Sequence, residues 1–159
     1  MNNQSINWKD PLYFQNILSE EEVNISKIAK EFCKSQLAPR VINDNKKQLF
    51  DKELYKEFGK LGFLGPTING YGCAGASNIS YGLIAKEFEA IDSGYRSAIS
   101  VQSSLVMHPI YEFGSKLQKE KYLPELCSGK KIGCFGLTES EAGSDPKSMK
   151  TKKSQYFEF

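Results

Sequence analysis

The sequence predicts a mainly α-helical fold, an up-and-down bundle of about six helices with one or two short strands at its C-terminal end. The 159 residues suffice for one ordinary globular domain, and 40% of them are apolar and 25% charged. Through the first three-quarters of the chain, apolar residues recur at helical spacing behind capping residues. From residue 131 on, a short apolar run lacks that spacing and is bounded by glycine and polar residues, which is typical of a buried strand.

The first predicted helix begins at Ser19. Ser19 and Glu22 match a capping box, in which the serine hydroxyl accepts from the third helical N–H and the glutamate reaches back to the cap amide. Apolar residues then recur at i, i+3, i+4 and i+7, which predicts one buried stripe made of Ile25, Ile28, Ala29 and Phe32. Pro39 lacks an amide N–H and disfavours helical backbone at the residue before it, so the helix is expected to break or kink there.

A second helix is predicted behind Asp51, which can cap its start, and Gly62 lies just past its end. Its inward side chains are expected to be Leu54, Tyr55, Phe58 and Leu61. Residues 62–75 contain five glycines and one proline, which predicts a long irregular loop. Loops of this kind in compact domains tend to be functional or mobile.

A third helix is predicted behind Ser77, another capping residue. Its apolar side chains are Ile79, Leu83, Ile84, Phe88 and Ile91. Residues 92–94 (Asp-Ser-Gly) are expected to interrupt the helix, after which an apolar helix resumes as far as Val106.

His108 and Pro109 are then expected to break the helix and restart the chain. Ser115 and Gln118 match a second capping box, which opens a last helix running to about Leu126.

The C-terminal residues predict a different kind of structure. Residues 131–138 are expected to form a buried strand, and residues 150–159 the approach to another. One or two strands do not form a stable sheet by themselves. The sequence therefore predicts a helical domain over residues 1–129 and the start of a β-domain over residues 130–159, with the sequence stopping shortly after that domain begins.

Charge excludes one class of function. The formal net charge is +2, which is too balanced to indicate a nucleic-acid partner. Of the 21 basic residues only Arg40 and Arg96 are arginines, the residue type best suited to phosphate groups and base edges. No nucleic-acid binding is expected, and the two arginines stand out as candidates for specific roles.

Other patterns narrow the class further. No apolar run approaches the ~18 residues of a membrane-spanning helix, so no membrane insertion is expected. The four cysteines form no C-x-x-C pair, and only one histidine accompanies them, which indicates free thiols rather than a zinc site or a disulfide framework. Residues 1–5 show neither a secretory signal nor a transit peptide, so a cytoplasmic location is expected, or the mitochondrial matrix in a eukaryote.

Residues 136–148 (GLTESEAGSDPKS) are the most informative part of the sequence. Free backbone N–H groups in this turn, with the hydroxyls of Thr138 and Ser144, can bind a pyrophosphate or the edge of a heteroaromatic ring, because successive unpaired amides form an anion-binding nest. Gly143 allows a close approach of the backbone. From the residues alone a polar hairpin turn is an equal alternative, since neither a P-loop nor a Rossmann fingerprint is present.

Residues 136–148 also resemble the signature of the acyl-CoA dehydrogenases, flavoenzymes that desaturate acyl thioesters. Residues 61–68 (LGFLGPTI), 70–75 (GYGCAG) and 92–109 (DSGYRSAISVQSSLVMHP) resemble one subfamily, the glutaryl-CoA dehydrogenases. The resemblance covers nearly the whole chain. It implies the N-terminal helical bundle of that family, followed by the first strands of its middle β-domain.

The resemblance implies FAD as the cofactor and glutaryl-CoA as the substrate. The residues implied to bind FAD are Phe135, Gly136, Leu137, Thr138, Glu139, Gly143 and Ser144. Ser144 is also implied to lie near the thioester arm of the substrate. Arg96 and Ser97 match the family's substrate-binding pair, with Arg96 on the distal carboxylate and Glu89 and Ser100 as polar neighbours. The alternative for Arg96 is a surface ion pair with Glu89.

In such enzymes a carboxylate base removes the α-proton, a hydride leaves the β-carbon for the flavin, and a dicarboxylic product can lose CO₂. Electrons then pass to an electron-transfer flavoprotein or a similar acceptor. The family's base lies in a C-terminal domain that no residue here matches, so no catalytic residue is assigned and the chain is expected to be inactive alone. A second polypeptide supplying the missing domains is one alternative. Another is a non-enzymatic helical module that binds a protein partner or acyl-CoA.

Overall fold

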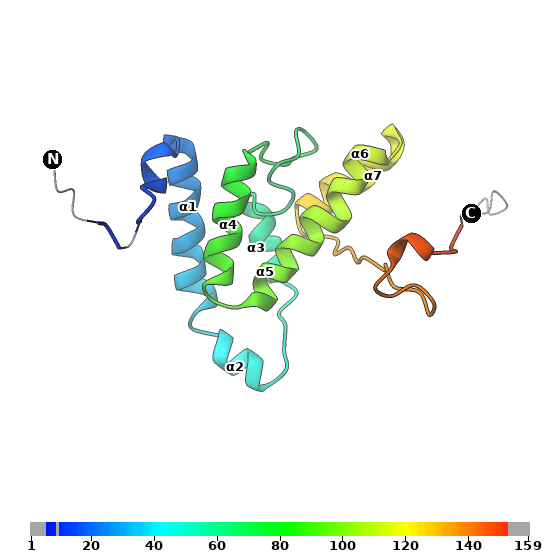
Figure 1. Cartoon of the computed structure of the whole chain (residues 1–159), viewed down its shortest axis with the longest axis horizontal. Helices are drawn as coiled ribbons and strands as arrows, with labels where there is room; N and C mark the ends of the chain where they lie inside the picture. The colour runs from blue at the N-terminus through cyan, green and yellow to red at the C-terminus, as the bar shows by residue number, and fades with distance from the viewer. Residues whose placement is uncertain (1–5, 9, 153–159) are drawn as a thin grey trace.

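The computed structural model describes residues 6–8 and 10–152, and it is a bundle of short helices from which a C-terminal segment extends (Figure 1). The α-helices are α1 (Glu20–Phe32), α2 (Val41–Lys46), α3 (Leu54–Lys60), α4 (Asn78–Glu89), α5 (Ser93–Ser100), α6 (His108–Phe113) and α7 (Lys116–Cys127). Two π-helical segments are η2 (Cys33–Leu37) and η3 (Val101–Met107), and two 3₁₀ turns are η1 (Phe14–Ile17) and η4 (Pro146–Ser148). The predicted helical fold class is confirmed.

One capping box and one N-cap serine hold α1 and α4 against each other at their N-terminal ends. The Ser19 hydroxyl accepts from the Glu22 amide at 3.2 Å, and the Ser19 amide donates to the Glu22 carboxylate at 3.0 Å. The other carboxylate oxygen of Glu22 accepts from the hydroxyl of Ser77 at 2.7 Å, and Ser77 itself caps α4 by accepting from the Ser80 amide. Helices α1 and α4 therefore begin at the same end and lie side by side (Figure 1).

An aromatic cluster forms the centre of the core. Phe32, Phe58, Phe63 and Phe88 come from α1, α3, the loop after α3, and α4. The ring centroids of Phe58 and Phe88 lie 5.1 Å apart and those of Phe63 and Phe88 lie 5.4 Å apart, both edge to face. This geometry is favourable for aromatic pairs, and it holds three helices around one point.

Two side chains predicted to face inward do not. Ile28 and Leu61 are 48% and 41% exposed, whereas Ala29 and Phe58 are fully buried. Ile28 and Leu61 instead border a small apolar hollow of about 50 Å³. Apolar periodicity predicts which side of a helix faces the core but not how wide that buried face is. Ile28 and Leu61 both lie at the edge of the buried face of their helix.

The predicted break at Asp92 is confirmed, and the one at His108 is wrong. Asp92 caps α5 by accepting from the Gly94 amide at 2.7 Å. Helices α5, η3 and α6 then follow one another without interruption, and the backbone of His108 is helical, with φ −63° and ψ −46°. Its amide donates to the carbonyl of Ser103, five residues back. This wider π-helical register directly before Pro109 lets the helix continue past a residue that lacks an N–H.

Helix α7 begins at the predicted capping box of Ser115 and Gln118 and ends at Cys127. Gly129 then redirects the chain with φ +70°, and a Cβ there would lie 2.0 Å from the carbonyl oxygen of Tyr55. Only glycine fits this left-handed position against α3.

The predicted strand over residues 131–138 is wrong: the described part of the chain contains no strand, only an isolated antiparallel bridge between Glu139 and Ala142. A strand needs a neighbour to pair its N–H and C=O groups, and the described residues supply none. Of the second predicted strand, residues 150–152 are not in a strand and residues 153–159 lie outside the described residues. The domain boundary at residue 129 stays a prediction. Within the described ranges, no helix is both long and apolar enough to cross a membrane.

Candidate functional site

The first half of the candidate site lies where α4 gives way to α5. The Arg96 Nε donates to one carboxylate oxygen of Glu89 at 2.8 Å, and the Ser93 hydroxyl donates to the other at 2.6 Å. Arg96 and Glu89 are 38% and 49% exposed, so the pair is open to solvent. The surface ion pair that the sequence left open as an alternative is therefore present.

The pair leaves binding capacity on the guanidinium. The hydrogen bond from Ser93, and then that from Arg96, lowers the pKa of Glu89, so its carboxylate stays ionised and holds the Nε edge of Arg96. No Nη atom of Arg96 makes a hydrogen bond within the described part of the chain. The outer edge of the guanidinium is thus free to receive a second carboxylate.

Two further predicted residues lie on the same helix. Ser97 is exposed and Ser100 half-buried, and both belong to α5. Arg96 and Ser100 are four residues apart within α5, so their side chains share one face of that helix. Ser93 meets Glu89 across the break between α4 and α5. Ser93 was missed from the sequence, because the helix break between it and Glu89 removes any helical spacing that could have indicated the contact.

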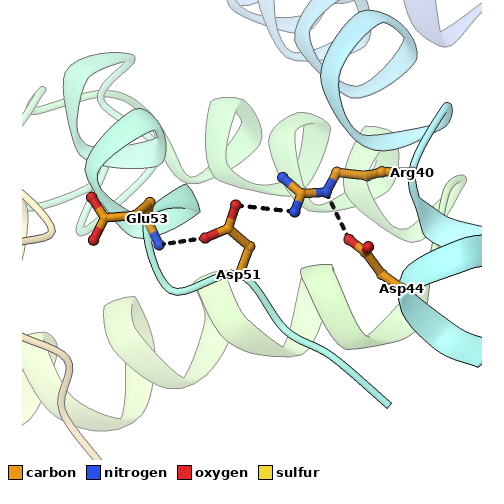
Figure 2. Close-up of polar contacts among 4 residues, drawn as sticks. All are labelled: Arg40, Asp44, Asp51 and Glu53. Carbon is orange, nitrogen blue, oxygen red and sulfur yellow. Dashed lines mark hydrogen bonds and ion pairs between the residues drawn. The ribbon is translucent and has the colours of Figure 1, made fainter. Parts of the chain in front are cut away.

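The other arginine has a structural role. Figure 2 shows Arg40 between two carboxylates, with its Nε 2.7 Å from Asp44 and its Nη2 3.0 Å from Asp51. The second oxygen of Asp51 accepts from the amide of Glu53, and this bond, followed by Arg40, lowers the pKa of Asp51. Arg40 therefore ties the start of α2 to the turn that opens α3, and Arg96 is left as the candidate for ligand binding.

The second half of the candidate site is the extended segment of residues 134–144. Phe135 and Leu137 are 47% and 39% exposed, and a Cβ at Gly136 or Gly143 would meet nothing within 4 Å. The amides of residues 134–138 donate no hydrogen bond among the described residues. The segment thus presents consecutive N–H donors that no described residue engages, beside the exposed apolar side chains of Phe135 and Leu137.

Glu139 and its neighbours close the turn that follows. The Glu139 carboxylate accepts from the amides of Lys150 at 2.8 Å and Thr151 at 3.0 Å. The side chain of Thr151, followed by these two amides, lowers the pKa of Glu139. The carboxylate of Glu139 is therefore engaged by backbone amides of this chain, at Lys150 and Thr151. Thr138 and Ser144, by contrast, are exposed, and their hydroxyls make no hydrogen bond within the described residues.

Gln102 holds the residues that lead into the second half of the site, and sequence reasoning missed it. Its side chain is 1% exposed; the amide nitrogen donates to the carbonyls of Leu126 at 3.0 Å and Lys131 at 2.9 Å, and the oxygen accepts from the Gly133 amide at 2.9 Å. One buried amide thus fixes the end of α7 and the root of the extended segment. A lone glutamine in an apolar run carries no signal of this role.

The structure does not bring Arg96 and the segment 134–144 into contact, since no hydrogen bond or ion pair joins them among the described residues. They are linked through one helix instead. Arg96 and Gln102 are six residues apart along α5 and η3, which is roughly 9 Å of helix axis.

Comparison with known protein families supports the resemblance. Residues 19–130 match the family model described as acyl-CoA dehydrogenase, N-terminal domain. An acyl-CoA dehydrogenase of Bacillus subtilis is 37% identical over 135 residues, which is 84% of this chain and 36% of that protein.

Solved structures show the same fold. A glutaryl-CoA dehydrogenase from Mycobacterium smegmatis, in complex with FADH2, matches with a TM-score of 0.84 and 46% identity over 87% of this chain and 36% of that one. Butyryl-CoA dehydrogenase from Megasphaera elsdenii matches with a TM-score of 0.77 and 37% identity over 84% of this chain and 36% of that one. The chain thus spans about a third of the length of these relatives. It belongs to the acyl-CoA dehydrogenase family, of which residues 19–130 match the N-terminal domain.

Proposed function

We propose that this chain carries part of the FAD and acyl-CoA sites of an acyl-CoA dehydrogenase whose substrate is a dicarboxylic thioester such as glutaryl-CoA. The observation that carries the substrate choice is Arg96, whose Nε is held by Glu89 while its Nη atoms make no hydrogen bond to any described residue. A planar guanidinium fixed at one edge can bind a carboxylate at the other by paired, charge-assisted hydrogen bonds.

The proposed role of Glu89 is orientation. Its carboxylate accepts from both Ser93 and Arg96, so the guanidinium has a preferred direction before a substrate binds. Orientation before binding reduces the ordering cost of the complex. A thioester whose acyl chain lacks a distal carboxylate has nothing to accept hydrogen bonds from the Nη atoms of Arg96. The arginine therefore favours an acyl chain that ends in a carboxylate.

The segment 134–144 fits a flavin. Its free N–H donors suit a pyrophosphate or the polar edge of the ring, its exposed Phe135 and Leu137 suit the ring face, and the open Cβ positions at Gly136 and Gly143 allow close approach. FAD, when bound, supplies the acceptor for the electrons removed from the substrate. The residues of this chain orient both molecules.

The proposed reaction is α,β-desaturation followed by loss of CO₂, which converts glutaryl-CoA to crotonyl-CoA. The proposed electron acceptor is an electron-transfer flavoprotein or a similar protein. No residue of this chain is assigned the role of base. Desaturation, loss of CO₂ and the electron acceptor are proposed from the family resemblance. Binding of the substrate and of FAD is proposed from the residues described above.

The substrate proposal can be tested by calorimetric titration of the chain with glutaryl-CoA and with pentanoyl-CoA, which has the same chain length but no distal carboxylate. Arg96→Gln is expected to weaken glutaryl-CoA binding about tenfold, through loss of charge-assisted bonds, and to leave pentanoyl-CoA unchanged. Lys52→Gln removes one exposed positive charge elsewhere and is the control. Equal losses for both thioesters would contradict the role of Arg96. Acyl-CoA binding without any FAD binding would favour the helical binding module instead.

A further inference from the structure

Two cysteines far apart in the sequence meet beside the C-terminal end of α7. Cys127 is the last residue of α7 and is 3% exposed, and Cys73 lies half-buried in the loop between α3 and α4. The Cys127 thiol donates to the carbonyl oxygen of Gly72 at 3.1 Å, so its sulfur lies next to the peptide unit that joins Gly72 to Cys73. Cys127 belongs to the buried apolar core, and Cys73 packs against that core.

The environment makes the two thiols unequal. The hydrogen bond from Cys73 lowers the pKa of Cys127, and the same bond, together with burial, raises the pKa of Cys73. The thiolate is the reactive form of cysteine, so Cys127 is the nucleophile of the pair. Cys127 contacts the carbonyl of the residue directly before Cys73, so Cys73 is the thiol next in line to meet an oxidised form of that sulfur.

A small molecule can reach Cys127 although the residue is largely buried. A hollow of about 490 Å³ lies beside it and is lined by Tyr71, Gly72, Pro124, Cys127 and Ser128, together with residues of α3. The other two cysteines differ. Burial raises the pKa of Cys33 to about 12, and Cys134 is exposed, and neither has a thiol neighbour in the described part of the chain.

We propose that Cys73 and Cys127 are an oxidation site at which hydrogen peroxide forms an intramolecular disulfide. In the first step the Cys127 sulfur attacks peroxide, the O–O bond breaks, and a sulfenic acid and one water result. In the second step the Cys73 sulfur attacks, the S–O bond breaks, the S–S bond forms and a second water leaves. One peroxide takes up the two electrons that the two thiols give up.

The disulfide would fasten the glycine-rich loop of residues 62–76 to the end of α7. It closes a long loop of chain, and such cross-links stabilise the folded state chiefly by restricting the unfolded one. The thermal midpoint of the oxidised chain is therefore expected to rise by roughly 5–10 °C, and dithiothreitol is expected to reverse the rise.

The test is peptide mapping of the purified chain before and after treatment with hydrogen peroxide. The expected result is loss of two hydrogens in the intact mass and a disulfide-linked pair of peptides containing Cys73 and Cys127. Cys134→Ser, the matched control, should keep this disulfide, whereas Cys127→Ser should lose it. In Cys73→Ser, the sulfenic acid on Cys127 should be trapped by dimedone.

Mapping of the unsubstituted chain needs no variant, so misfolding of a variant leaves the test intact. Oxidation confined to Cys134, with Cys73 and Cys127 both recovered as thiols, overturns the proposal. A disulfide that includes Cys33 overturns it as well.

Discussion

At the scale of single residues, Gly133 decides how closely the C-terminal segment meets the helices. A Cβ at Gly133 would lie 2.3 Å from Cγ1 and 2.8 Å from Cγ2 of Val106, both closer than real contacts allow. Val106 is β-branched and stiff, so the backbone of the segment would have to move. That movement would also stretch the hydrogen bond from the Gly133 amide to Gln102.

Gly133→Ala is therefore expected to lower the free energy of unfolding by about 1–3 kcal/mol, as overpacking of a filled site does. Gly136→Ala, three residues on, meets open space and should change it by less than about 0.5 kcal/mol. Urea unfolding of the two variants measures the difference. Equal effects would mean that the segment does not pack on Val106 in solution.

The hydrogen bonds around Gly133 include one to Gln102, a residue whose role could not be predicted from the sequence. The sequence indicated the functional interest of residues 136–148 from their hydroxyls and glycines. It did not indicate Gln102, because three hydrogen bonds to Leu126, Lys131 and Gly133 depend on backbone groups that only the fold brings together. Local patterns carry no information about such distant partners.

At the scale of elements, the capping boxes are the best-predicted features and one of them does more than cap. Ser19 and Glu22 form the box that opens α1, and the free carboxylate oxygen of Glu22 binds the hydroxyl of Ser77 at the start of α4. The amide of Ser19, followed by the hydroxyl of Ser77, lowers the pKa of Glu22 below its ordinary value of 4.5.

A carboxylate whose pKa is lower in the folded state stabilises the fold above its unfolded pKa and loses that contribution as the pH falls through the folded value. Unfolding free energy is therefore expected to fall below about pH 4.5, and Glu22→Gln should make that fall less steep. Glu21→Gln, which removes a neighbouring charge outside the box, is the control. Urea unfolding between pH 3 and 7 tests this, and identical pH profiles for Glu22→Gln and the unsubstituted chain would contradict it.

Helix boundaries followed from the sequence wherever a local hydrogen bond sets them, as at Ser19, Asp92 and Ser115. Pro109 misled the prediction, because a π-helical turn before it changes the register of hydrogen bonds. Such a turn is stabilised by packing of the surrounding helices, so it cannot be predicted from a short stretch of sequence.

At the scale of the whole molecule, the helical body and the extended segment differ in how their backbones are satisfied. Helix α4 has buried side chains at Ile84 and Phe88 and regular helical hydrogen bonds. The amides of residues 134–138 have no hydrogen-bond partner among the described residues. Amide protection depends on such bonds, so the two regions should exchange hydrogen at very different rates.

Hydrogen exchange is expected to be at least about 100-fold faster at residues 134–138 than at residues 84–88. Under the proposed function, adding FAD should slow exchange in the first region and leave the second unchanged. Mass spectrometry of the exchanged chain measures both. Slow exchange at residues 134–138 without FAD would contradict the structure, whereas fast exchange unaffected by FAD would contradict only the proposed cofactor site.

The sequence by itself determined the helical class, the helix starts at Ser19, Ser77, Asp92 and Ser115, and the turn that resembles a flavin-binding signature, because each of these depends on neighbouring residues or on a stretch read in order. It did not determine the start of α3, where Glu53 and not the predicted Asp51 is the capping residue. Tertiary structure alone decided the rest. It placed Cys127 against the carbonyl of Gly72, next to Cys73, and it placed Arg40 between Asp44 and Asp51. Among the described residues it left the Nη edge of Arg96 without a hydrogen bond and residues 131–138 without a partner strand. Contacts of this kind join backbone and side chains far apart in the chain, and only the folded arrangement specifies their distances.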